Sequence, residues 1–230
     1  RMQRSKSTVV HPLYRTAAIR HDYFSVENMK LYPERFVLVG FIAADGCIHM
    51  KKSKNRIYPY LCFNLAEKDK AALDIINHEL ACGQRNLSYT KKTKSFQLYF
   101  PSEQIASDLS RWGIVPRKTA TFQMPRIFGN DLRYFLRGLF FGDGCMGNYK
   151  MSSNKTRLVM HILCTAAMAS TLKEHLEKNV VNHCCLSVLK NRPNYAQIVL
   201  QAANAEAFAK YIFHDDLMPL LDGKIVKINQ

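Results

Sequence analysis

A ten-residue segment occurs twice in this chain, and the repeat constrains the fold more than any other feature of the sequence. Residues 38–47 read LVGFIAADGC and residues 136–145 read LRGLFFGDGC, at a constant offset of 98 residues. Internal similarity at a fixed offset indicates that a structural unit has been duplicated. Asp45 and Asp143 hold the same place in the two copies. We therefore predict two similar halves, each built around one copy.

The segments that follow each copy also recur in the same order. Each half continues with an apolar strand-like run, an amphipathic helix, a second hairpin and a final helix. In the first half these segments are 58–65, 67–80, 86–100 and 102–112, and in the second half they are 158–164, 166–179, 184–201 and 204–213. The pattern predicts an α+β fold of two pseudo-symmetric αββαββα halves, 33–125 and 126–230. Residues 1–32 have no counterpart, and we expect a basic, partly extended arm there.

Small residues recur one helical turn apart in both copies. Gly40 and Ala44 occupy these positions in the first copy, and Gly138 and Gly142 occupy them in the second. Small side chains at positions i and i+4 flatten one face of a helix, so that another backbone can come close. Glycine inside a helix costs roughly 1 kcal/mol relative to alanine, and its recurrence therefore indicates close packing. The natural partner of each helix is the other copy, packed about a pseudo-twofold axis.

Each copy ends on an aspartate followed by a glycine. Gly46 and Gly144 are typical of the position just after a helix, where the backbone turns left-handed. Asp45 and Asp143 then stand at the negative ends of their helix dipoles, which is unfavourable by about 0.3–1 kcal/mol each. Packing the helices side by side adds repulsion between the two carboxylates. A divalent cation relieves both effects, and Mg²⁺ prefers such oxygen ligands. The alternative is that Asp-Gly only marks a turn.

The repeated segments 38–46 and 136–144 resemble the two LAGLIDADG motifs of homing endonucleases. The resemblance covers roughly residues 34–228 and is to the single-chain, intron-encoded type, which carries both motifs on one polypeptide. It implies that the motif helices form the central interface and that the halves make a saddle of antiparallel sheets on DNA. This chain has Ala43 and Phe141 at the sixth letter of the motif in place of aspartate. That position is not the metal ligand in the family.

The resemblance also implies the chemistry. In the family the last acidic residues of the motifs bind Mg²⁺ (or Mn²⁺) and catalyse cleavage of both DNA strands, leaving 3′ overhangs. These roles fall to Asp45 and Asp143, with Ala44 and Gly142 as further residues of the metal site. Two carboxylates that hold a metal beside a phosphate suit a hydrolytic centre. We therefore predict a site-specific double-strand DNA endonuclease that acts as a monomer on a long asymmetric target.

Two lysines are further candidates by the same resemblance. Family members commonly place a lysine after the last helix of each half, where it reaches the cleavage pocket, and the matching residues are Lys118 and Lys224. A lysine there stabilises charge on the phosphate or polarises water; the alternative is an ordinary exposed lysine. Glu67 matches a position where relatives often have a polar pocket residue, whereas the second half offers Thr165 or Ala166. This asymmetry fits two unequal strand-cleavage sites.

The distribution of charge predicts where DNA binds. A formal net charge of +15 indicates an anionic partner, either nucleic acid or an acidic membrane surface. The hairpin segments 47–63, 86–100, 145–164 and 184–204 contain no Asp or Glu. Basic residues on strands favour nucleic acid, because a membrane-binding helix would carry them itself. The candidate DNA contacts are Lys51, Lys52, Lys54, Arg56, Lys91, Lys92, Lys94, Lys150, Lys155, Arg157, Lys190 and Arg192.

Two other functions fit the same motifs. One is an RNA maturase of the LAGLIDADG type, which assists intron splicing by binding structured RNA. The other is a DNA-binding regulator that does not cleave. Retention of both Asp45 and Asp143 favours the nuclease over the regulator, but maturases can also keep these residues. The sequence contains no P-loop, dinucleotide fingerprint or H-E-x-x-H motif, so no other cofactor is expected.

The seven cysteines are scattered and include no C-x-x-C pair. Zinc sites usually draw four ligands at favourable spacing, and the only local cluster in the sequence is His183, Cys184 and Cys185. We therefore interpret the cysteines as free thiols in a reducing intracellular compartment, such as the cytoplasm, the nucleoid or an organelle matrix. No apolar run approaches the roughly 20 residues that a membrane-spanning helix needs, and we expect no secretory signal in the basic N-terminal segment.

Overall fold

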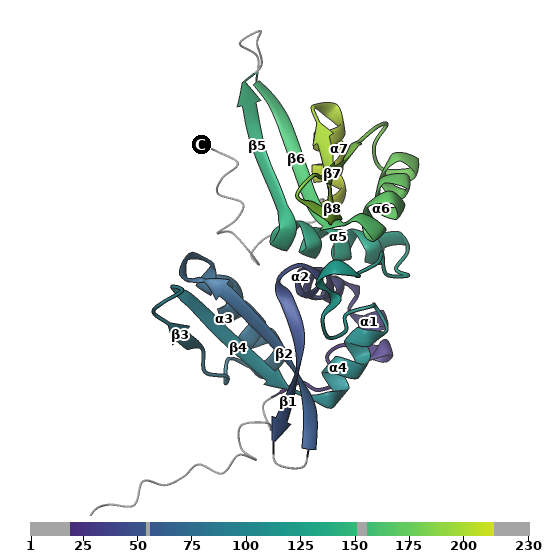
Figure 1. Ribbon diagram of the computed structural model, residues 1–230. Helices are drawn as coiled ribbons and strands as arrows, with labels where there is room; N and C mark the ends of the chain where they lie inside the picture. Colours follow the sequence, from purple (N-terminus) through teal and green to yellow (C-terminus); the bar gives the residue numbers. More distant parts are fainter. Residues whose placement is uncertain (1–18, 54–55, 151–155, 214–230) are drawn as a thin grey trace, which may run out of the picture.

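Two antiparallel four-stranded sheets flank a central pair of helices in the computed structural model, which describes residues 19–53, 56–150 and 156–213 (Figure 1). The first half contains α1 (Val26–Leu31), η2 (Pro33–Arg35), α2 (Phe36–Asp45), β1 (Gly46–Ser53), β2 (Arg56–Ala66), η3 (Glu67–Asp69), α3 (Lys70–Ala81), β3 (Ser88–Thr90), β4 (Ser95–Pro101), α4 (Glu103–Ser110) and η4 (Lys118–Ala120). The second half contains α5 (Gly129–Asp143), β5 (Gly144–Lys150), β6 (Thr156–Thr165), α6 (Ala166–Asn179), β7 (Cys185–Leu189), β8 (Arg192–Gln201) and α7 (Ala203–Phe213).

The two halves share one topology. The strand order is β1-β2-β4-β3 in the first sheet and β5-β6-β8-β7 in the second. Each motif helix runs directly into the first strand of its sheet, at Gly46 and at Gly144. The predicted α+β class and the repeated αββαββα order are confirmed. No helix among the described residues is long and apolar enough to span a bilayer.

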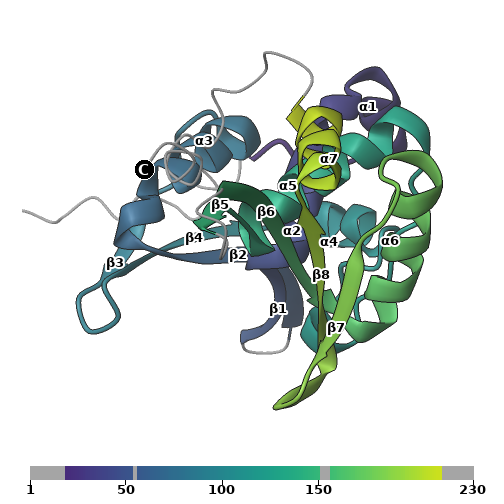
Figure 2. The same ribbon diagram turned by 90° about the horizontal axis from the view of Figure 1, so that it is seen from above.

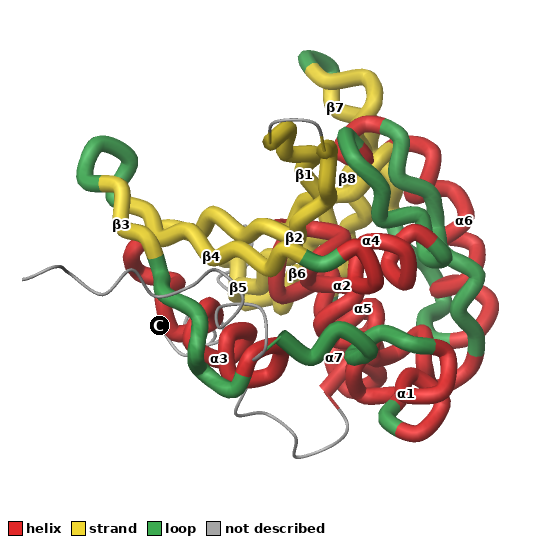
Figure 3. The backbone as a smooth tube through the Cα atoms, turned by 90° about the horizontal axis from the view of Figure 1, so that it is seen from below, coloured by secondary structure: helices red, strands yellow, loops and turns green. Residues whose placement is uncertain are grey.

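Alternation along the strands buries one face of each sheet. Leu61 and Phe63 of β2 are fully buried, as are Ile198 and Leu200 of β8. Because side chains alternate along a strand, the residues between them point to the opposite face. Helices α3 and α4 pack on the first sheet, and α6 and α7 pack on the second, where α6 lies along β7 and β8 (Figure 2). The strands therefore lie on one side of the molecule, with α1, α3 and α7 on the other (Figure 3).

Helices α2 and α5 pack against each other at their glycines, in a reciprocal arrangement. A Cβ atom on Gly40 would lie 2.8 Å from the backbone nitrogen of Leu139, and one on Gly138 would lie 2.8 Å from that of Phe41. Each glycine also faces a carbonyl oxygen of the other helix. Contacts under 3.0 Å are essentially never seen for real Cβ atoms, so only glycine permits this approach. The pseudo-twofold packing predicted from the small residues is confirmed.

Gly46 and Gly144 depart from the left-handed conformation that we expected after the motif helices. Their φ and ψ angles are −91° and 161° at Gly46, and −91° and 158° at Gly144, which is extended backbone. The requirement for glycine is instead steric. A Cβ on Gly46 would lie 2.9 Å from the Cα of Ile42, and one on Gly144 would lie 2.6 Å from the Cγ of Phe140. Each strand thus begins pressed against the last turn of its own motif helix.

The segment 19–32 is not the extended arm that the sequence predicted. It contains helix α1, and Ile19, Phe24 and Met29 are buried in the core of the first half. The backbone nitrogen of Arg20 also donates a hydrogen bond to the carbonyl oxygen of Leu80, at 2.8 Å. These apolar side chains lack a regular period, so their burial depends on tertiary neighbours rather than on local pattern. The rest of the expected arm, residues 1–18, lies outside the described residues.

Candidate active site

The two motif aspartates lie at adjoining helix ends. Asp45 is the last residue of α2 and Asp143 is the last residue of α5, and both side chains are half-buried. The ends of these helices meet, since a Cβ on Gly142 would lie 3.2 Å from the Oδ2 atom of Asp45. The absence of a side chain at Gly142 therefore keeps the space beside this carboxylate open. The structure brings together the two halves of the predicted metal site.

Lys118 comes from the connection between the halves and reaches the same helix ends. Its side chain is buried, and its Nζ atom donates a hydrogen bond to the carbonyl oxygen of Ala43, at 2.7 Å. Burial lowers the pKa of the lysine, while the negative charges of Cys47, Asp143 and Asp45 raise it. Lys118 is therefore within electrostatic reach of both aspartates. The alternative of an ordinary exposed lysine is wrong.

A cavity of about 120 Å³ opens beside Asp143 and Lys118. Thr165 lies in its wall, caps the first turn of α6 through its hydroxyl oxygen, and donates to the carbonyl oxygen of Phe122. Burial and the charge of Asp143 raise the pKa of the Cys164 thiol to about 12, so the thiol stays protonated. The cavity is thus bounded by the ends of the two motif helices, by Lys118 and by the second sheet. Its lining residues are Ala43, Ala44, Lys118, Thr119, Phe122, Leu139, Asp143, Leu163, Cys164, Thr165, Met168 and Tyr195.

Comparison with solved structures identifies the arrangement. The chain is similar to the I-LtrWI LAGLIDADG homing endonuclease bound to target DNA, with a TM-score of 0.59 and 13% identity over 86% of this chain and 88% of that one. It is similar to the meganuclease I-SmaMI bound to uncleaveable DNA, with a TM-score of 0.56 and 15% identity over 80% and 85%. It is also similar to the meganuclease I-AabMI bound to uncleaved DNA, with a TM-score of 0.51 and 16% identity over 84% of this chain and 96% of that one. This chain has the LAGLIDADG homing endonuclease fold.

The likeness is carried by structure rather than by sequence. No family model matches the chain, and no curated protein matches it significantly. Within the LAGLIDADG fold, the motif helices are α2 and α5, and the two sheets extend from them as the two sides of the saddle. The predicted central interface and saddle of antiparallel sheets are therefore confirmed.

The candidate DNA contacts that the structure describes lie towards the outer ends of the hairpins of this fold. Lys51 and Lys52 are near the end of β1, and the other described candidates lie in or beside the remaining hairpin ends, all exposed apart from the half-buried Arg157. Arg56 makes an exposed ion pair with Glu103 at 2.7 Å, which reduces its freedom to contact phosphate. Lys54, Lys155 and Lys224 lie outside the described residues. The remaining candidates are Lys91, Lys92, Lys94, Lys150, Lys190 and Arg192.

Glu67 and Thr165 hold equivalent places but differ in environment. Glu67 follows β2 and is exposed, and its Oε2 accepts a hydrogen bond from the hydroxyl of Tyr89 at 3.2 Å. Thr165 ends β6 and is buried in the wall of the cavity. Ala166 does not line the cavity. The asymmetry expected between the halves is thus present, and the residue of the second half that faces the cavity is Thr165.

A larger, mostly apolar cavity of about 260 Å³ lies between α2, α3 and α5. Its walls include Tyr23, Phe41, Ile76 and Phe141, and neither motif aspartate is among them. Size alone favours it as a ligand site. The smaller cavity, in contrast, is lined by the motif residue Asp143 and the buried Lys118.

One group of residues beside the motif was not apparent from the sequence. The thiols of Cys47 and Cys62 and the imidazole of His49 lie close together on β1 and β2. A hydrogen bond with Cys62 lowers the pKa of the Cys47 thiol to about 6, helped by the nearby charges of His49 and Lys118. The alternation Cys47-x-His49 is visible in the sequence, but the partner strand and its register are not.

Proposed function

We propose that this protein is a site-specific double-strand DNA endonuclease whose divalent metal is bound by Asp45 and Asp143. The observation that carries the proposal is the placement of these aspartates at adjoining helix ends, between two sheets whose hairpins end in basic residues. The similar structures I-LtrWI, I-SmaMI and I-AabMI are described with bound DNA, which supports DNA as the partner. We propose that the protein acts as a monomer, because one chain contains both halves of the pseudo-symmetric site.

The residues at the helix ends fit a hard divalent cation. Carboxylate oxygens and backbone carbonyls are the ligands that Mg²⁺ or Mn²⁺ prefers. Ala44 and Gly142, which precede the two aspartates, would offer backbone carbonyl oxygens beside them. Gly142 keeps space open next to the Oδ2 atom of Asp45. When bound, the cation would neutralise charge on the phosphate and activate water. I-SmaMI with uncleaved DNA was solved in the presence of calcium ions, a cation with the same preference for oxygen.

The other residues of the site would position the phosphate and select the target. The ammonium group of Lys118 is held by the Ala43 carbonyl oxygen, where it would stabilise negative charge that develops during hydrolysis. The exposed lysines of the hairpin turns would contact phosphates along the duplex. Because Glu67 and Thr165 differ between the halves, we propose a long asymmetric target. We also propose cleavage that leaves 3′ overhangs, with the two strands cut at unequal rates.

The test is cleavage of a randomised duplex library by the full chain in Mg²⁺. Parallel reactions contain EDTA in place of the metal, or the double variant Asp45→Asn/Asp143→Asn. The matched control is Asp74→Asn, which removes an exposed carboxylate that pairs with Lys70 on the outer helix α3. We expect one long site to be cut in both strands by the wild type and by the control, only when the metal is present.

Other outcomes would replace the proposal. Tight duplex binding without any cleavage by the wild type would indicate a DNA-binding regulator. Weak duplex binding without cleavage, together with tight binding of intron RNA, would indicate a maturase. Cleavage by the double variant at the wild-type rate would show that the aspartates do not hold the catalytic metal.

A further inference from the structure

Three potential metal ligands converge on the face of the first sheet that the helices leave open. Cys47 and His49 are two residues apart on β1, so both side chains point to the same face. Ile48, between them, is buried in the core and marks the opposite face. Cys62 is the direct cross-strand partner of Cys47 in the β1–β2 ladder. Strand alternation and register together therefore place the three side chains in one group.

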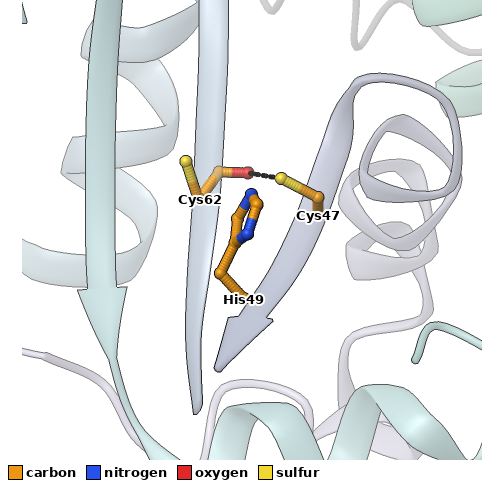
Figure 4. Close-up of side chains that lie close together, drawn as sticks. All are labelled: Cys47, His49 and Cys62. Carbon is orange, nitrogen blue, oxygen red and sulfur yellow. Dashed lines mark hydrogen bonds between the residues drawn. The ribbon is translucent and has the colours of Figure 1, made fainter. Parts of the chain in front are cut away.

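The ligand atoms are close enough to share one ion. The two Sγ atoms and a ring nitrogen of His49 all lie within 4.8 Å of one another, and Figure 4 shows the imidazole beside the two thiols. The Cys47 thiol donates a hydrogen bond to the Cys62 carbonyl oxygen at 3.6 Å, which orients it toward the neighbouring strand. Zinc bonds of about 2.0–2.3 Å require ligand atoms within roughly 4 Å of one another. To reach that spacing the ligand atoms would draw closer together, and the Cys62 thiol would release its hydrogen bond to the Phe63 carbonyl oxygen, now at 3.7 Å.

We propose that Cys47, His49 and Cys62 form a Zn²⁺ site, separate from the oxygen site at Asp45 and Asp143. Two thiolates and an imidazole are the ligands of a borderline-soft cation, whereas carboxylates bind Mg²⁺. Three protein ligands leave the fourth tetrahedral position open. Cys62 is buried and His49 is exposed, so this position faces outward, on the side of the sheet that would meet DNA. A bound ion would cross-link β1 to β2 next to the end of α2.

The second half supplies an internal comparison. Cys145 on β5 corresponds to Cys47, and its cross-strand partner is His161. Gly147 stands where β1 has His49. Cys185 and His183 also approach each other, at 3.8 Å. His183 also contacts Glu177, at 2.9 Å between Nδ1 and Oε1. Among the described residues, however, Cys47, His49 and Cys62 alone bring three such ligand atoms within 4.8 Å of one another.

The first test is a titration of the reduced full chain with Co²⁺, which replaces zinc in tetrahedral sites and reports its ligands by absorption. We expect thiolate-to-cobalt charge-transfer absorption that saturates at one ion per chain and disappears when Zn²⁺ is added. Competition with a zinc-binding dye then gives the affinity for Zn²⁺. Both readouts are independent of DNA cleavage, so this inference does not depend on the proposed function.

Variants assign the site. Cys47→Ser/Cys62→Ser should abolish the charge-transfer band. His49→Ala should weaken Zn²⁺ binding by at least about tenfold, which is the loss that even an outer-shell partner of a metal ligand causes. His49 is exposed, so its variant tests the proposal even if the buried Cys62 cannot be replaced without unfolding. The matched control is Cys145→Ser, which removes the equivalent thiol of the second half and should leave binding unchanged.

Two further results distinguish this thiolate site from the other places where cobalt could bind. Asp45→Asn/Asp143→Asn should keep the thiolate band, because those carboxylates belong to the oxygen site. The proposal is overturned if cobalt gives no thiolate band with the wild type. It is equally overturned if the band survives in Cys47→Ser/Cys62→Ser, or is lost in Cys145→Ser or Cys185→Ser.

Discussion

The Nζ atom of Lys118 lies 2.7 Å from the carbonyl oxygen of Ala43 and donates a hydrogen bond to it. Ala43 belongs to the last turn of α2, two residues before Asp45, so the bond ties the connection between the halves to the end of the motif helix. The lysine is buried, and burial lowers its pKa while the nearby Cys47, Asp143 and Asp45 raise it. Burying a cation is costly for folding. We therefore expect Lys118 to serve the reaction rather than the stability of the fold.

Replacing Lys118 should separate activity from stability. We expect Lys118→Met to lower the single-turnover cleavage rate about 10²–10³-fold, because a positive group next to the reacting phosphate is lost. The free energy of unfolding in urea should stay the same or rise, since an apolar side chain replaces a desolvated charge. Lys178→Met, at an exposed position on α6, is the control and should change neither quantity. Nearly wild-type cleavage by Lys118→Met would remove this lysine from the catalytic centre.

The glycine contact between α2 and α5 gives a second prediction. A Cβ on Gly138 would press on the backbone of α2 near Phe41, so Gly138→Ala should destabilise the protein by about 1–3 kcal/mol and force the helices apart. Cleavage should fall as well, because Asp143 lies at the end of the displaced helix. The control is Gly147→Ala, whose Cβ would meet only the Tyr149 ring, at 3.6 Å. Urea unfolding of both variants measures the difference, and equal stability would contradict the close packing.

The hairpin lysines predict the salt dependence of DNA binding. If about eight phosphates are contacted, the logarithm of the binding constant should fall against the logarithm of the salt concentration with a slope near −7. Lys91→Ala/Lys92→Ala, in the β3–β4 turn, should reduce that slope by about 2. Lys30→Ala/Lys210→Ala, at exposed positions of α1 and α7 on the side of the molecule away from the strands (Figure 3), serves as the charge-matched control and should keep the wild-type slope. A slope that is unchanged by the hairpin substitutions would place the phosphate contacts elsewhere.

The features that could be predicted from the sequence are those set by local pattern and by duplication. The repeat placed Asp45 and Asp143 at equivalent helix ends, and the recurring Gly40 and Gly138 predicted the packing between the helices. Helix α6 has the predicted limits, Ala166–Asn179, because its apolar period is regular and Thr165 caps its first turn. Each of these signals lies within one segment or in the comparison of two segments.

The features that could not be predicted depend on partners distant in the chain. Ile19 and Phe24 are buried by contacts that no local period announces. Gly46 was assigned a left-handed backbone, whereas its space is limited by Ile42 in the preceding turn. The grouping of Cys47 with Cys62 requires the strand register, and a change of one residue would turn one thiol to the opposite face.

The carboxylate of Glu177 predicts how the stability of the second half depends on pH. A hydrogen bond from Lys173, another from the backbone nitrogen of Cys184 at 3.0 Å, and the charges of Lys173 and His183 lower the pKa of Glu177 to about 2, from 4.5. The folded state thus binds this proton less readily than the unfolded state. The stabilisation is therefore complete above pH 4.5 and is lost as the pH falls towards 2.

Glu177→Gln should lose less stability than the wild type between pH 6 and pH 3, measured by urea unfolding. Glu174→Gln, at an exposed position of the same helix, should retain the wild-type loss. Equal losses in Glu177→Gln and the wild type would show that these contacts do not stabilise the ionised carboxylate.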